Sequence, residues 1–120
     1  RGCIGTTGPT TNNVAWEIVQ NAVSACSRDP RFVPVQADEL DSLEYSVDVL
    51  GEPEAISSPA ELDIKRYGVI VSCGGRRGLL LPDLDGVDTI EQQIDIARQK
   101  GGISSREQYS LERFEVVRHT

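Results

Sequence analysis

The prediction of the fold starts from residues Tyr67–Pro82, YGVIVSCGGRRGLLLP. The two apolar runs of this stretch, Tyr67–Cys73 and Gly78–Leu81, have the length of buried strands. The four residues between them begin with two glycines, which can adopt the positive φ of a tight turn. The stretch therefore predicts a β-hairpin that ends at its closing proline. Two arginines at the predicted tip, Arg76 and Arg77, suit either a solubilising role or the binding of an anion.

An amphipathic helix precedes the hairpin in the sequence. Between Val14 and Arg28 the polar residues recur every three or four positions, and apolar residues fill the other arc. A residue of the segment Thr10–Asn12 is expected to cap the helix start. The pair Asp29-Pro30 is expected to end it, because a residue before proline is pushed out of the helical region. On the apolar arc lies Cys26, which we expect to be buried as a small hydrophobe.

The remaining elements follow from the same patterns. A second amphipathic helix, with acids in its first turn and bases in its last, is predicted from Thr89 to Lys100. The order along the chain is strand, helix, extended segment, strand, hairpin, helix and strand, with the first strand at the N-terminus. The other predicted elements are strands at Leu43–Leu50 and Leu111–Val117 and short helical turns at Ala37–Ser42 and Ser57–Glu61.

The charge balance argues against nucleic acid and anionic membranes as partners. Twelve basic residues against nineteen acidic ones give a net charge of −7. Nine acids and no Lys or Arg fall between Gln36 and Ile64, a pattern typical of a solvated acidic face. No apolar run approaches the roughly 20 residues of a membrane span. The sequence has no methionine and opens on Arg1, which suggests a fragment of a longer chain.

The three cysteines are far apart and include no C-x-x-C pair. With a single histidine, they form neither a disulfide framework nor a zinc site, and the sequence predicts no bound metal. Free thiols favour the reducing cytoplasm as the location of the protein. The last residue of an apolar run, Cys73, is expected to end a strand.

One stretch, Gly2-Cys3-Ile4-Gly5, suggests chemistry. Glycines on both sides of a cysteine allow a ligand or another backbone to approach closely and leave the sulfur unshielded. A guanidinium close to Cys3, from Arg1 or Arg31, would favour the thiolate and make the residue a nucleophile or redox group. Alternatively, Cys3 is a small core residue in a tightly packed strand.

The sequence resembles the AMMECR-type family, and within it the bacterial branch called protein A of the AmmeMemoRadiSam system. The matching segments occur in the family's order and span nearly the whole chain. They are Arg1–Thr6, Asn21-Ala22, Asp29–Phe32, Glu39-Leu40, Tyr45–Leu50, Tyr67–Val71, Gly78–Pro82 and Lys100–Ile103. The family usually has alanine where Gly101 stands and carries a helix and a strand before the Arg-Gly-Cys motif. We therefore expect residues 1–120 to be a single AMMECR-like domain that lacks its N-terminal part.

The resemblance implies an α+β fold with a mainly antiparallel sheet, two principal amphipathic helices and short helical turns, which agrees with the predicted order of elements. It implies no established reaction, and the cofactor remains unknown. The name of the bacterial branch records an association with a MEMO-like protein and a radical SAM enzyme, which suggests a common pathway.

The resemblance also supplies candidate site residues. Cys3 and Arg31 are the candidate catalytic residues. The candidate substrate-binding residues are Arg1, Gly2, Gly5, Thr6, Asp29 and Phe32. Two functions remain open: an enzyme or substrate-binding subunit that uses Cys3, and a non-catalytic module that docks a partner through the segment Asp29–Phe32, which pairs an arginine with an aromatic residue.

Overall fold

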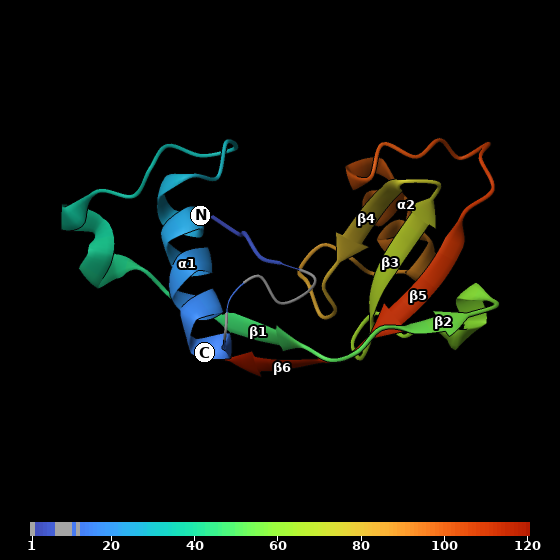
Figure 1. Cartoon of the computed structure of the whole chain (residues 1–120), viewed down its shortest axis with the longest axis horizontal. Coiled ribbons are helices and arrows are strands. Elements are labelled where there is room, and N and C mark those ends of the chain that lie inside the picture. The colour runs from blue at the N-terminus through green and yellow to red at the C-terminus, as the bar shows by residue number, and fades with distance from the viewer. Residues whose placement is uncertain (1, 7–10, 12) are drawn as a thin grey trace. The chain divides into compact units, whose positions relative to one another are not determined.

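The computed structural model describes residues 2–6, 11 and 13–120, and the chain divides into two compact units. One unit comprises residues 1–47 and 119–120, and the other comprises residues 48–118. The elements in chain order are α1 (Val14–Ser27), a 3-10 helix (Ala37–Ser42), β1 (Val47–Leu50), β2 (Glu54–Ile56), a 3-10 helix (Pro59–Glu61), β3 (Gly68–Cys73), β4 (Arg76–Leu80), α2 (Ile90–Lys100), β5 (Ser110–Phe114) and β6 (Val116–His119) (Figure 1).

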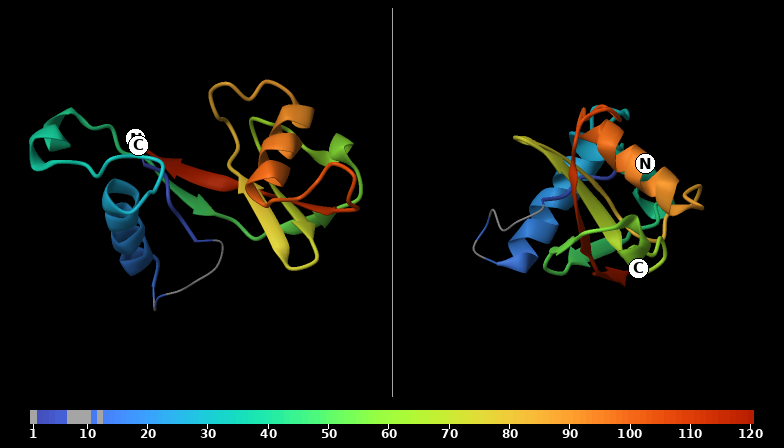
Figure 2. Two further views of the ribbon diagram at one scale, coloured as in Figure 1. Left: turned by 90° about the horizontal axis from the view of Figure 1, so that it is seen from above. Right: turned by 90° about the vertical axis from the view of Figure 1, so that its right-hand side faces the viewer.

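The core belongs to the unit of residues 48–118. Its sheet has the order β2-β5-β3-β4, and every pair of neighbours is antiparallel. Figure 2 shows α2 crossing one face of this sheet, where it packs on β3 and β4. The fully buried Val69 and Val71 of β3 meet Ile94 and Ala97 of α2 in one apolar cluster. The predicted α+β fold with a mainly antiparallel sheet is thus confirmed.

The predicted hairpin is present, with a shorter turn than expected. Only Gly74 and Gly75 form the turn, and Gly74 adopts a φ of 60°. The two arginines after the glycines are strand residues, since Arg76 pairs with Cys73 across the ladder. A two-residue turn satisfies more backbone groups than the four-residue loop that we predicted, because the ladder continues to the tip.

Helix α2 sits unusually close to the hairpin. Thr89 caps its start by accepting a hydrogen bond from the Gln92 amide. A Cβ on Gly78 of β4 would lie 1.7 Å from the carbonyl oxygen of Ala97, so strand and helix backbones touch. Glycine at position 101 is part of the same contact, because a Cβ there would lie 2.8 Å from the carbonyl carbon of Arg77. An alanine at that position would require the strand to shift.

Helix α1 forms within the predicted bounds but differs from the prediction in two respects. Its N-cap is Asn13, whose side chain accepts from the Trp16 amide, so the expected cap within Thr10–Asn12 is wrong. None of its residues is buried, and Cys26 is exposed. The periodic pattern identified a helix with an apolar arc, but nothing in the described chain buries that arc. No helix in the described residues is long and apolar enough to span a membrane.

The strands outside the hairpin deviate from the predicted bounds. Of Leu43–Leu50 only Val47–Leu50 is a strand, and it pairs with β6. The predicted final strand is two strands, because the chain changes partner at Glu115, whose carbonyl accepts from the Gly51 amide at 2.7 Å. Strand β2 was not predicted, and residues 2–6 form no strand. The short helical turns at Ala37–Ser42 and near Pro59 are confirmed.

Candidate functional site

Residues 2–6, which we call the strap, lie against α1 within the unit of residues 1–47. Gly2 has a φ of 101°, and a Cβ on it would lie 2.1 Å from the carbonyl oxygen of Ala25, so only glycine fits. Gly5, in contrast, has no heavy atom within 4 Å of a Cβ position. Of the two glycines in the motif, Gly2 is therefore the one required by a close backbone contact.

The carboxylate of Asp29 holds the strap at Cys3. Its side chain is almost fully buried, and it accepts from the Cys3 amide at 3.0 Å. It also accepts from the amide, Nε and Nη2 of Arg31, the last at 2.6 Å. These bonds, the Arg31 guanidinium first among them and the Cys3 amide next, hold the pKa of Asp29 far below its usual range. Asp29 is thus ionised and fully engaged at neutral pH.

Arg31 forms, together with Asp29, a clamp on the backbone of Cys3. Its Nη2 donates to the Cys3 carbonyl oxygen at 3.1 Å, so both backbone polar groups of Cys3 are held. The hydrogen bond to Asp29 raises the pKa of Arg31. The guanidinium also lies over the ring of Phe32, 5.2 Å from its centre. Phe32 is 41% exposed, so it stacks on Arg31 at the surface and is not a core residue.

The thiol of Cys3 belongs to an exposed residue on this clamped backbone. The alternative that Cys3 is a core residue in a strand is therefore wrong. The structure brings Asp29 and Arg31 to the backbone of Cys3, beside Gly2. Arg31 is one of the two guanidiniums that we expected close to this residue. Arg1, the other expected member, lies outside the described residues.

A groove lies between the strap and α1. It has a volume of about 560 Å³ and combines aliphatic, amide and hydroxyl side chains with one cation. The predicted site residues Gly5 and Thr6 line it. The remaining lining residues are Ile4, Val19, Gln20, Asn21, Val23, Ser24 and Arg28. The strap thus contributes Cys3 to the clamp and Ile4, Gly5 and Thr6 to the groove wall.

Glu17, in the first turn of α1, is a site residue that the sequence reasoning missed. One carboxylate oxygen accepts from the Thr6 hydroxyl at 2.9 Å and the other accepts from the Thr11 amide at 3.1 Å. In the sequence it is one of the polar residues that recur every three or four positions between Val14 and Arg28. An acid in a first turn beside a threonine-rich segment was the available signal, but it is equally typical of ordinary helix capping.

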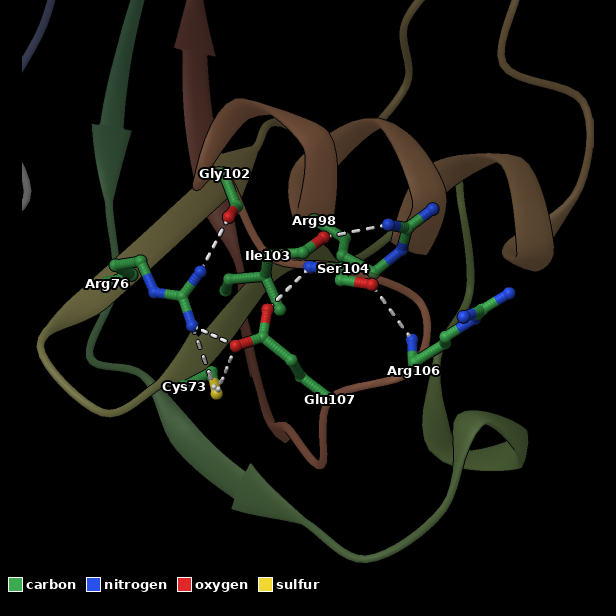
Figure 3. Close-up of polar contacts among 8 residues, drawn as sticks. All are labelled: Cys73, Arg76, Arg98, Gly102, Ile103, Ser104, Arg106 and Glu107. Carbon is green, nitrogen blue, oxygen red and sulfur yellow. Dashed lines mark hydrogen bonds and ion pairs between the residues drawn. The ribbon is translucent and has the colours of Figure 1, made fainter.

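The hairpin arginines do not form a second site. Arg76 pairs with Glu107 and donates to the carbonyl oxygen of Gly102 at 2.7 Å (Figure 3). Arg77 pairs with Glu112. Both arginines are exposed, as the solubilising role requires, and their guanidiniums pair with acids of the fold instead of standing free to bind an anion. Cys73 ends β3 as predicted, and its sulfur lies 3.8 Å from Nη2 of Arg76. Among the residues that the structure describes, no group of three or more His, Cys, Asp or Glu side chains could hold a metal ion.

The antiparallel sheet, the packed helix α2 and the Gly-Cys-Ile-Gly motif held at its cysteine backbone define the class: an α+β protein with a clamped cysteine. The model of the AMMECR1 family matches residues 1–119, and the chain belongs to that family. A protein from Thermotoga maritima is 58% identical over 87 residues, which cover 72% of this chain and 50% of that protein. A Clostridium acetobutylicum protein is 54% identical over 119 residues, which cover 99% of this chain and 25% of that protein.

A solved structure gives the same result for the fold. The crystal structure of an uncharacterised protein from Pyrococcus horikoshii matches with a TM-score of 0.82 and 28% identity. The match covers 98% of this chain and 63% of the other. The chain therefore spans half or less of the two sequence relatives and under two thirds of this structural one. None of these names assigns a reaction.

Proposed function

We propose that this AMMECR1-family chain is an enzyme, or the substrate-binding subunit of one, in which Cys3 is the nucleophile or the thiol anchor. The observation that carries the proposal is that Asp29 and Arg31 hold both backbone polar groups of Cys3 while the residue itself stays exposed. A fixed backbone beneath an exposed thiol lowers the entropy cost of bringing that thiol to a substrate.

The groove beside the strap is the proposed substrate site. Gly5 and Thr6 form part of its wall, and they follow Cys3 closely in the chain. Arg31 takes a different part from the one that its residue type first suggested. Its Nε and Nη2 already bind Asp29, so we assign it to positioning Cys3 rather than to pairing an anionic substrate group.

The partners proposed for this activity are a MEMO-like protein and a radical SAM enzyme in a common pathway. Support comes from the resemblance to the bacterial branch that is named for this association. A metabolite comparison between cells that lack the full-length gene and cells that lack the MEMO-like protein or the radical SAM enzyme tests the pathway. Shared accumulation of one metabolite supports it, and unrelated profiles contradict it.

The thiol proposal is tested by alkylation of the folded protein with iodoacetamide, followed by mass spectrometry of each cysteine. Cys26 is the internal control, because it is also exposed. We expect Cys3 to react faster than Cys26 and Cys3→Ala to reproduce the phenotype of a gene deletion, with Cys26→Ala as the matched variant. A Cys3 that reacts no faster than Cys26, together with an unchanged phenotype for Cys3→Ala, would contradict the proposal.

A second candidate is a non-catalytic module that docks a partner protein. It is favoured by the exposed aromatic and aliphatic surface that follows the clamp, where Phe32 is 41% and Val33 is 73% exposed. Arginine stacked on an aromatic ring is a common centre of protein interfaces. Co-purification with the radical SAM enzyme or the MEMO-like protein should then fail for Phe32→Ala and survive in Cys3→Ala. Co-purification that survives in Phe32→Ala and fails in Cys3→Ala favours the thiol chemistry.

A further inference from the structure

The strap is held at two ends. Near Gly2 and Cys3 it is fixed by the close contact with Ala25 and by the clamp. At Thr6 the hydroxyl donates to Oε2 of Glu17. Both attachments involve α1 or the residues just after it, so they lie within one unit.

The two attachments match the length of the strap. Four residue steps separate Gly2 from Thr6, and an extended chain covers about 13 Å in that number. Eight steps of helix separate Glu17 from Ala25, which corresponds to a rise of about 12 Å. The strap therefore runs against the direction of α1 with little spare length. Loss of one attachment therefore gives the residues between the two attachments more conformational freedom.

From this geometry we infer that Glu17 is a positioning residue for the thiol site, acting on Cys3 and on the groove through its hydrogen bond to Thr6. This inference rests on the proposed function for its significance, since Cys3 and the groove are the site that Glu17 would position.

The second bond of Glu17 adds to this role. Its other carboxylate oxygen accepts from the Thr11 amide at 3.1 Å. One carboxylate thus joins the end of the strap to the residue that leads into α1 through Asn13. An alanine at position 17 loses both bonds. A glutamine can still accept from the Thr6 hydroxyl through its one carbonyl oxygen, but its amide group cannot accept from the Thr11 amide.

Two measurements test the inference in the full chain. The first is hydrogen exchange of the strap amides in Thr6→Val, which keeps the side-chain shape and removes the hydroxyl. We expect exchange to become about fivefold faster, the factor that corresponds to the loss of one ordinary hydrogen bond. The same increase is expected in Glu17→Ala. Thr6→Ser, which keeps the hydroxyl, should restore the slow rate. Glu91→Ala makes the same change in the first turn of α2 and should leave the strap unaltered.

The second measurement is the ratio of the Cys3 and Cys26 alkylation rates in the same variants. We expect this ratio to change in Thr6→Val and Glu17→Ala and to return to the wild-type value in Thr6→Ser. Strap exchange that is unchanged in both Thr6→Val and Glu17→Ala overturns the inference. If Cys3 already reacts no faster than Cys26 in the wild type, the proposed thiol function fails, and strap exchange alone then decides whether Glu17 holds the strap.

Discussion

The two main helices show the difference between the two units. Both are amphipathic in sequence, and both begin with a side chain that caps the first turn. Helix α2 buries Gln93, Ile94 and Ala97 against the sheet, whereas α1 buries no residue. Instead, α1 contacts the strap, and the two clamp residues follow its C-terminal end in the chain. An apolar arc in a sequence thus identifies a surface suited to packing without identifying what packs there.

The largest expected effect is on stability and comes from the apolar cluster between α2 and the sheet. Ile94→Ala should lower the free energy of unfolding by about 2–5 kcal/mol, because it opens a cavity under the sheet. Val19→Ala on α1, where the residue is 52% exposed, should change it by less than about 0.5 kcal/mol. Urea unfolding measures both. A Val19→Ala cost close to that of Ile94→Ala would show that the arc of α1 is buried in solution.

The next effect concerns the helix caps. Asn13→Ala and Thr89→Ala each remove a side chain that accepts from a first-turn amide, a change that typically costs about 1 kcal/mol. The cost should be expressed differently in the two units. In α1, without buried residues, it should fray the first turn and speed exchange of the Trp16 amide. In α2, which is packed on the core, it should lower global stability. Equal fraying of both helices by hydrogen exchange would contradict this.

A smaller and local effect is expected at the hairpin tip. Arg76 ties β4 to the loop after α2 through Glu107 and the carbonyl oxygen of Gly102 (Figure 3). Arg76→Gln should therefore speed exchange of the Ser104 amide, which donates to Glu107 at 2.7 Å. Arg77→Gln is the matched control, because its pair with Glu112 is longer, at 3.7 Å, and lies on the strand. Similar exchange in the two variants would show that Arg76 does not order the loop.

Much of the unit with the core could be predicted from the sequence. The hairpin, α2 with its start at Thr89 and the turn at Pro59 follow from local rules on periodicity, capping and turn residues. The partner change at Glu115 could not, because it depends on which strand lies beside each half of the segment. Strand β2 was missed for a different reason, since three residues after a proline carry too short a pattern to be recognised.

The site was predictable in its members and less so in their roles. The Gly-Cys-Ile-Gly motif and the Asp29–Phe32 segment were found by composition and resemblance, and the structure joins them through the Asp29 carboxylate. That Asp29 would be buried and that Arg31 would bind a backbone carbonyl depend on contacts 26 and 28 residues apart in the chain. Glu17 was missed because a solvent-facing acid and a strap anchor look alike in a helical pattern.

The smallest expected effect is the change of stability with pH that Asp29 contributes. It distinguishes the clamp from the ion pairs of the unit of residues 48–118. The pKa of Asp29 is depressed in the folded chain, while an unfolded aspartate titrates near 3.9. The stabilisation from its ionised form is therefore complete well above pH 4 and is lost as pH falls toward the folded pKa. Only the upper part of that loss falls between pH 5 and pH 3.

Asp29→Asn removes this titration, so the drop in Tm between pH 5 and pH 3 should be smaller in the variant than in the wild type. Some acid sensitivity should remain, because Arg76 and the Ser104 amide also lower the pKa of Glu107. Glu107→Gln should reduce the drop as well, but without affecting exchange of the Cys3 amide. Asp29→Asn should accelerate that exchange even at pH 7, since an uncharged amide holds Arg31 less strongly. An Asp29→Asn variant with the full wild-type drop and unaltered Cys3 exchange would mean that the clamp contributes nothing to folding.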